Sequence, residues 1–309
     1  MVGGVAGATR TDWAVAKDVA GGGSAGGEEP VLFLAAGSRV AADVDQVAEQ
    51  PRRNDLNGKV GGIHFRHMSS VFPDRIINSR WAWFLRGLPV LPRASAMFQA
   101  KRYTMTTPAR CRHLWDMCKE VLDKRVPGCF VECGVWKGGS SAIMALAIKD
   151  SGQERALHLY DSFEGLPEPT EKDGESAAAY SGGRNQGKLA SIDACRAGVS
   201  EVRHLMIDKI QMKENKVRFH VGWFQDTVPA TAQELGPIAF LRLDGDWYDS
   251  TKVCLDHLYP LLSPGGVIVL DDYLTWEGCR KATDEYRERE DIDDVIRPID
   301  GYAAYWVKR

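Results

Sequence analysis

Hydrophobic and polar positions alternate regularly only from about residue 107 onward. Thr107-Pro108 pairs a hydroxyl side chain with a following proline, which favours the start of a helix, and Pro127-Gly128 ends that helix. Beyond it, short apolar runs alternate with stretches of helical periodicity. The apolar runs predict strands over 129–133, 156–160, 217–221, 238–243 and 267–270. The periodic stretches predict helices over 140–149, 249–262 and 277–290.

This alternation of buried strands with helices is typical of a mostly parallel sheet with helices on both faces. Residues 294–299 and 302–307 flank Asp300-Gly301, a dipeptide that favours a hairpin between two strands. The chain is therefore predicted to be an α/β protein with a seven-stranded, mostly parallel sheet that ends in an antiparallel hairpin.

The part before residue 107 has a different composition. Residues 1–60 are crowded with glycine and alanine, and residues 21–27 resemble a flexible linker, so we expect a low-complexity, disordered extension. Residues 61–106 carry many apolar side chains mixed with arginine and proline, which favours a segment that covers the edge of a domain. The domain itself is expected over 107–309.

Charge and composition exclude several classes of protein. Lysine and arginine total 39 against 42 aspartate and glutamate, a net charge of −3, so a strongly basic nucleic-acid binder is not expected. No apolar run approaches the about 18–20 residues that span a bilayer, so no membrane partner is expected either. The cysteines are odd in number, form no CxxC pair and follow no secretory signal, which favours reduced thiols in a cytoplasmic protein.

In an open α/β sheet, ligands bind at the carboxyl ends of the strands. The first strand is followed by a glycine-rich turn with Glu132, Gly134 and Ser140, where backbone amides and a helix start can approach a ligand. Its spacing is GxxxGG, so it does not match the GxGxxG pattern of dinucleotide-binding proteins. Glu132 would repel a pyrophosphate, and it is a candidate partner for the ammonium group of an amino acid.

The next strands end in further candidates for cofactor binding. Asp161 and Ser162 follow the second strand, where an acid commonly accepts hydrogen bonds from the ribose hydroxyls of adenosine. Gly222 and Trp223 follow the strand over 217–221; the glycine permits close approach, and the indole is a candidate wall for adenine. Two acids after consecutive strands favour S-adenosylmethionine over NAD.

A cluster of carboxylates is expected at the last two parallel strands. Asp244 follows one of these strands, and Asp271 and Asp272 follow the other, so the three side chains should lie close together. Like charges this close require a proton or a cation, and oxygen ligands suit Mg²⁺, Ca²⁺ or Mn²⁺ rather than zinc. Asp246 is the alternative third ligand, and spacing alone does not choose between them.

Several segments, in this order, resemble the macrocin O-methyltransferase family. They are YTMTTP over 103–108, GCFVECGVWKGGSS over 128–141, YDSFEGLP over 160–167, GWFQDT over 222–227, LRLDGDWYDST over 241–251 and DDY over 271–273. Together they cover about residues 100–309, and the combination is far more specific than any single motif.

The resemblance implies a class I methyltransferase fold, Rossmann-like, that uses S-adenosylmethionine and Mg²⁺. It implies transfer of a methyl group to a hydroxyl of a deoxysugar, often on a glycosylated natural product, by a homo-oligomeric enzyme. By analogy it assigns the metal to Asp244, Asp271 and Asp272 instead of Asp246, and it places Thr104 and Met105 near the methionine end of the cofactor. Residues 168–216 diverge most from the family pattern, and this region together with the N-terminal covering segment over 61–106 is expected to take part in acceptor selection.

The chemistry expected from these residues is methyl transfer to a sugar hydroxyl, whose pKa lies far above 7. A cation bound to two vicinal hydroxyls would lower that pKa, and Asp244 is the expected metal ligand and general base. Three other readings remain open: an O-methyltransferase of a catechol or another vicinal diol, a non-enzymatic scaffold with the same fold, and a nicotinamide-dependent dehydrogenase.

Overall fold

The computed structural model describes residues 92–309, and the structural statements below concern that range. The extension predicted over residues 1–60 and the first part of the predicted covering segment, residues 61–91, lie outside the described residues. Within the described range, none of the helices combines the length and apolar character that crossing a membrane requires.

The centre of the described domain is a single mixed sheet of seven strands in the order β3-β2-β1-β4-β5-β7-β6. The strands are β1 (Cys129–Cys133), β2 (Leu157–Asp161), β3 (Val217–Val221), β4 (Ile238–Leu243), β5 (Leu262–Leu270), β6 (Arg297–Pro298) and β7 (Ala304–Val307). Strands β1 to β5 pair in parallel, whereas β7 pairs antiparallel with both β5 and β6. The predicted fold class, including its antiparallel end, is therefore confirmed.

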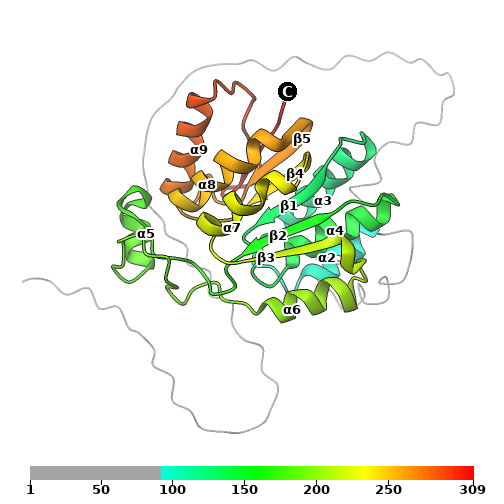
Figure 1. Ribbon diagram of the computed structural model, residues 1–309, viewed down its shortest axis with the longest axis horizontal. Coiled ribbons are helices and arrows are strands. Elements are labelled where there is room, and N and C mark those ends of the chain that lie inside the picture. Colours follow the sequence, from blue (N-terminus) through cyan, green and yellow to red (C-terminus); the bar gives the residue numbers. More distant parts are fainter. Residues whose placement is uncertain (1–91) are drawn as a thin grey trace, which may run out of the picture. The chain divides into compact units, whose positions relative to one another are not determined.

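Helices cover both faces of the sheet (Figure 1). On one face lie α2 (Pro92–Ala100), α3 (Pro108–Asp123), α4 (Gly139–Ser151) and α6 (Val199–His204); on the other lie α7 (Phe224–Thr231), α8 (Tyr248–Leu258) and α9 (Glu277–Arg289). Shorter helical pieces connect them: η3 (Glu171–Asp173), α5 (Gly174–Tyr180), η4 (Leu205–Lys209), η5 (Glu214–Lys216), η6 (Ala232–Glu234) and η7 (Tyr259–Leu261).

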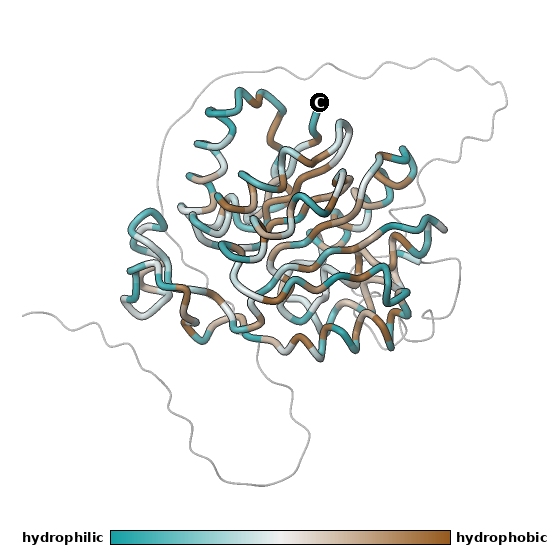
Figure 2. The backbone as a smooth tube through the Cα atoms, viewed as in Figure 1, coloured by the Kyte–Doolittle hydropathy of each residue, from teal (hydrophilic) through white to brown (hydrophobic). Residues whose placement is uncertain are grey.

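The two helix layers give the strands a buried environment on both sides. Along β1, Phe130 packs with Phe240 of β4 in the core under α3 and α4, while the next residue, Val131, joins the core under α8. Figure 2 shows the consequence: the central strands are mostly hydrophobic, whereas α9 is largely hydrophilic. Continuous apolar runs were the pattern that identified these strands in the sequence.

Local signals placed several element boundaries correctly, and pairing between distant segments decided the others. Thr107 caps α3, its Oγ1 accepting a hydrogen bond from the Arg110 amide at 3.1 Å. Strand β5 begins at Leu262, earlier than predicted, because the glycines that follow pair with the chain end: the Gly265 amide donates to the Lys308 carbonyl, at 2.7 Å. Strands β6 and β7 are shorter than the strands predicted over 294–299 and 302–307.

Residues 164–198 form a segment that stands beside the carboxyl ends of the strands and contains η3 and α5 (Figure 1). Asp173, fully buried, attaches this segment to the domain: its carboxylate accepts hydrogen bonds from the backbone amides of Tyr248 and Thr170, each at 2.6 Å. Gly278 leaves the space for it, because a Cβ there would lie 1.9 Å from Asp173 Oδ1. The sequence pattern predicted neither of these helical turns.

Candidate active site

A cleft of about 230 Å³ opens to solvent at the carboxyl edge of the parallel strands. Its lining comes from residues 103–106, 134–136, 139–140, 161–162, 165–167, 223–225, 244–246 and 271–272, with individual contributions from helix α3 and from the 164–198 segment. Strand ends far apart in the sequence therefore meet at one site, as the parallel topology requires.

Most of the residues predicted to bind the cofactor line this cleft. They are Thr104, Met105, Gly134, Ser140, Asp161, Ser162 and Trp223. Glu132 and Gly222 lie outside the lining. Gly222 contacts a lining residue, because its amide donates to the Asp161 carbonyl at 3.0 Å.

The glycine-rich turn is shaped by Asp161. Its Oδ2 accepts hydrogen bonds from the Val135 and Trp136 amides at 2.7 and 2.8 Å, and its Oδ1 accepts one from the Phe163 amide at 2.7 Å. Burial nevertheless raises the pKa of Asp161. A carboxylate has about four acceptor positions, so this side chain organises the turn and retains capacity for a ligand hydroxyl.

Gly134 shows why the turn needs glycine. It has a φ of 91°, and a Cβ at this position would lie 1.8 Å from the Asp244 carbonyl oxygen. The backbones after β1 and β4 are therefore in contact, which brings the glycine-rich turn next to the carboxylates.

Glu132 differs from its predicted role. It is fully buried beneath the cleft, where Ser141 Oγ donates to Oε2 and Arg242 Nη1 donates to Oε1 at 2.9 Å. Burial raises the pKa of Glu132 to about 7 although the Arg242 guanidinium opposes the shift. The Glu132 carboxylate is therefore paired with Arg242 and Ser141 inside the protein. It is not exposed to a ligand in the cleft.

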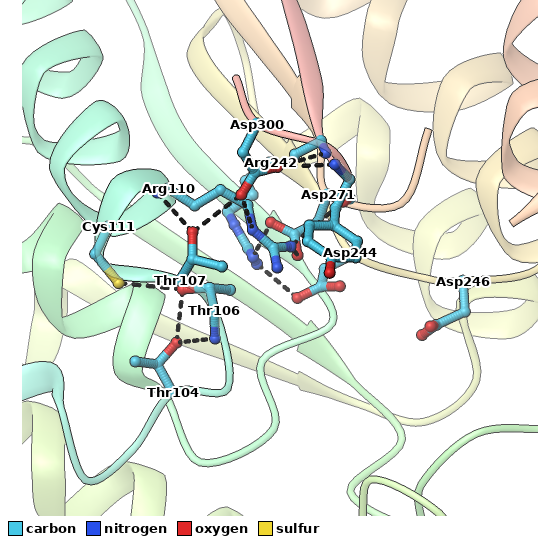
Figure 3. Close-up of polar contacts among 12 residues, drawn as sticks. Thr104, Thr106, Thr107, Arg110, Cys111, Arg242, Asp244, Asp246, Asp271 and Asp300 are labelled. Atoms are coloured by element: carbon cyan, nitrogen blue, oxygen red, sulfur yellow. Dashed lines mark hydrogen bonds and ion pairs between the residues drawn. The ribbon is translucent and has the colours of Figure 1, made fainter. Parts of the chain in front are cut away.

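Arg242 is the centre of the charge network shown in Figure 3. Besides Glu132, its guanidinium donates to Asp244 Oδ2 at 2.9 Å and to Asp271 Oδ1 at 2.7 Å. Burial disfavours the cation, but the three carboxylates, led by Asp271, raise the pKa of Arg242 well above its ordinary value. Arg242 therefore stays charged and fixes the orientation of three acids.

The predicted metal triad of Asp244, Asp271 and Asp272 is not the set that the structure groups together. Asp271 Oδ2 accepts from Arg110, which also lies 3.1 Å from Asp300 in the turn before β7. With Arg242 on its other oxygen, Asp271 is a counter-ion held by two guanidinium groups. Asp246, which the resemblance had set aside, lies near Asp244 and Asp272.

Asp244, Asp246 and Asp272 form the carboxylate cluster. One oxygen from each lies within 4.8 Å of the others. Burial, with Asp244 next, raises the pKa of Asp246 to about 8, and burial, with Asp246 and Asp244 next, raises the pKa of Asp272 well above its ordinary value. Among residues 92–309, Asp272 Oδ2 is a buried oxygen that no hydrogen-bond donor reaches. This all-oxygen donor set fits a hard divalent cation.

Sequence reasoning missed several residues of this site, among them Arg242, Trp276 and Cys195. Arg242 had a signal, because an arginine inside the apolar run IAFLRL needs a buried partner. Trp276 had none: its indole Nε1 donates to Asp246 Oδ1 at 2.8 Å across 30 positions of sequence. Cys195 had none either, since it reaches the cleft from the non-periodic part of the 164–198 segment.

Comparison with known proteins identifies the family. The model of the macrocin-O-methyltransferase (TylF) family matches residues 94–308. The chain belongs to the macrocin-O-methyltransferase family. It is accordingly an S-adenosylmethionine-dependent O-methyltransferase.

Similar proteins support this assignment. The chain is 37% identical over 205 residues to the 8-demethyl-8-(2,3-dimethoxy-alpha-L-rhamnosyl)-tetracenomycin-C 4'-O-methyltransferase of Streptomyces olivaceus, covering 66% of this chain and 75% of that protein. It is 32% identical to the demethyldecarbamoylnovobiocin O-methyltransferase of Streptomyces niveus, covering 79% and 84%. The solved structure of the O-methyltransferase NovP superposes with a TM-score of 0.58 at 29% identity, covering 74% of this methyltransferase and 99% of NovP.

Proposed function

We propose that this methyltransferase transfers the methyl group of S-adenosylmethionine to a hydroxyl of a deoxysugar on a glycosylated natural product, with Mg²⁺ as a required cation. The observation that carries the cation is the carboxylate cluster, in which Asp244, Asp246 and Asp272 converge and one buried oxygen lacks a donor. The sugar acceptor is supported by the rhamnosyl group named for the Streptomyces olivaceus relative.

The cofactor is proposed to lie along the wall made by the glycine turn and residues 103–106. Asp161 has acceptor capacity for the ribose, and Trp223 offers an aromatic face for the adenine. The positive end of α4, which begins at Gly139, suits the carboxylate of the methionine moiety. These residues fix the methyl donor, so that transfer depends on how the acceptor hydroxyl is presented on the other side of the cleft.

The carboxylate cluster is proposed to hold the cation, with Asp244, Asp246 and Asp272 each giving one oxygen. Mg²⁺ bound there would orient vicinal hydroxyls of the acceptor and lower the pKa of the hydroxyl that reacts. The chain must then accept the proton. Asp244 accepts a hydrogen bond from the Arg242 guanidinium on one oxygen, whereas Asp246 is hydrogen-bonded to the neutral indole of Trp276. We therefore assign the general base to Asp246, and not to Asp244 as the sequence suggested.

The experiment that tests the proposal follows transfer from methyl-labelled S-adenosylmethionine to a set of acceptors. The full chain is incubated with rhamnosylated polyketides and, for comparison, with 3,4-dihydroxybenzoate as a catechol, with Mg²⁺ or with EDTA. We expect label on the glycoside, loss of transfer in EDTA and recovery on adding excess Mg²⁺. Transfer only to the catechol would contradict the sugar acceptor, and transfer that persists in EDTA would contradict the cation.

A further inference from the structure

We propose that an apolar rim at the mouth of the cleft binds the apolar aglycone of the glycoside acceptor. The rim consists of Met105, Leu274 and Tyr302. The inference rests on the proposed function and deepens it, because it states what holds the part of the acceptor that lies outside the cleft. A nucleoside-diphosphate sugar carries the same deoxysugar on an anionic group, and it is the acceptor that this surface disfavours.

The first observation is that large apolar side chains are exposed at this mouth. Among residues 92–309, seven large hydrophobic side chains are exposed, and the three of the apolar rim lie at or beside the cleft. Met105 lines the cleft itself. Leu274 and Tyr302, 42% and 46% exposed, belong to the turns after β5 and before β7, and the Leu274 amide donates to the Tyr302 carbonyl at 2.8 Å. Exposed apolar side chains that gather at one place commonly mark a binding surface.

The second observation is that the rim is continuous with the cleft. Leu274 lies two positions after Asp272, which is a residue of the cleft lining. The guanidinium carbon of Arg110, another lining residue, lies 5.3 Å from the centroid of the Tyr302 ring. A deoxysugar whose reacting hydroxyl lies inside the cleft directs its aglycone outward, because the cleft must also hold the cofactor. Leu274 and Tyr302 border that exit on the β5 side.

The third observation is that the turn carrying Tyr302 is held in place by Asp300. Asp300 Oδ1 accepts hydrogen bonds from the Tyr302 and Ala303 amides at 2.9 and 3.1 Å. Its Oδ2 accepts one from Thr107 Oγ1 at 2.9 Å and lies 3.1 Å from Arg110 Nε, which ties the turn to the start of α3 (Figure 3). A surface that is already ordered loses little conformational freedom when a ligand packs on it.

The fourth observation is the charge of this mouth. Within the range that the structure describes, the basic side chains of the cleft lining are Arg110 and Arg242. Arg242 pairs with three carboxylates and Arg110 with two. A diphosphate is held by charge-assisted hydrogen bonds from available cations, whereas a neutral aglycone packs on apolar side chains without them. The rim therefore favours a neutral, apolar aglycone over a nucleoside diphosphate.

Two acceptors with the same deoxysugar separate the aglycone from the sugar. Methyl α-L-rhamnoside has no apolar aglycone, whereas a rhamnosylated tetracyclic polyketide has one, and transfer of labelled methyl by the full chain gives kcat and KM for each. Tyr302→Ser should raise KM for the polyketide glycoside about tenfold with kcat nearly unchanged, and should change kcat/KM for methyl α-L-rhamnoside by less than about twofold. Leu274→Ser should act in the same direction. Met105 is left unchanged because it also borders the proposed cofactor wall.

Two further variants are controls. Tyr302→Phe retains the ring, so its KM for the polyketide glycoside should stay within about twofold of wild type. Val295→Ser removes an apolar side chain that is 65% exposed, precedes β6 and lies outside the cleft lining, and it should change neither acceptor. Binding of S-adenosylhomocysteine reports that each variant is folded. Should Tyr302→Ser lose it, Tyr302→Leu, which stays apolar, should keep KM for the polyketide glycoside within about threefold of wild type, and a larger rise would overturn the inference.

The outcomes separate this inference from the proposed function. If the wild-type chain methylates neither rhamnoside, the proposed function itself is contradicted. If it methylates both with equal KM, or if Tyr302→Ser raises both KM values alike, the rim does not bind the aglycone. A lower KM for thymidine-diphosphate rhamnose than for the polyketide glycoside would also overturn the inference. If Tyr302→Ser and Leu274→Ser keep both KM values but lower the melting temperature of the full chain, the rim contacts residues 1–91 or a second copy instead of the acceptor.

Discussion

Replacing Asp246 with asparagine is expected to lower kcat by about a hundred- to ten-thousandfold, the range that a general base contributes. The variant keeps the size of the side chain and an oxygen for Trp276 Nε1, but it cannot take the proton of the acceptor hydroxyl. The rate is measured at a Mg²⁺ concentration that saturates the variant, so that weakened cation binding does not account for the loss. Affinity for S-adenosylhomocysteine should stay close to wild type.

Asp244→Asn and Asp271→Asn complete this experiment. Asp244→Asn should weaken cation binding, with much of the rate returning at high Mg²⁺, because its oxygen is shared with Arg242. Asp271→Asn should keep cation affinity, because two arginines occupy that carboxylate. A near-normal rate in Asp246→Asn together with an unrecoverable loss in Asp244→Asn would assign the base to Asp244 instead.

Arg242→Met is expected to lower the free energy of unfolding by about 3–5 kcal/mol, the loss typical of removing one partner from a buried ion pair. Arg242 and Glu132 have 3% and 0% side-chain exposure, and methionine fills the volume without pairing Glu132, Asp244 or Asp271. For a domain of this size the melting temperature should fall by roughly 6–20 °C, which differential scanning calorimetry measures.

Two variants show whether the unpaired charge is the cause. Adding Glu132→Gln to Arg242→Met should recover part of the loss, because the fully buried carboxylate is then neutral. Arg218→Met, on the exposed side of β3, should change stability by less than about 0.5 kcal/mol. A loss below about 1 kcal/mol in Arg242→Met would mean that the network contributes little to the fold.

The strands of the sheet could be predicted because their burial shows in the local sequence as short apolar runs. Runs such as CFVEC and IAFLRL are apolar on both faces, and the structure places β1 and β4 at the predicted residues. The beginning of β5 could not be predicted, because Ser263-Pro-Gly-Gly favours a turn. Pairing with the end of the chain nevertheless extends the strand through it. The helical turns η3 and α5 depend on Asp173 reaching α8, a contact between residues 75 positions apart.

The place of the cleft at the strand ends could be predicted from topology, whereas the pairing of its acids could not. Spacing after β4 and β5 predicted a group of carboxylates at one edge of the sheet. Which of them remain available to a cation depends on where Arg242 and Arg110 point, and both pair with Asp271. The Glu132 carboxylate likewise lies beneath the cleft, where it accepts hydrogen bonds from Arg242 and Ser141. These differences depend on charge pairs between strands and helices. The residue pattern of one segment does not show which distant residue it pairs with.

The most direct measurement is an anomalous difference map from crystals of the full chain grown with S-adenosylhomocysteine and Mn²⁺. The carboxylate cluster predicts one Mn²⁺ peak within about 2.0–2.6 Å of oxygens of Asp244, Asp246 and Asp272, with Asp271 still paired to Arg110 and Arg242. A peak bound by Asp244, Asp271 and Asp272, with Asp246 turned away, would contradict the assignment, as would a map without a peak in this cleft.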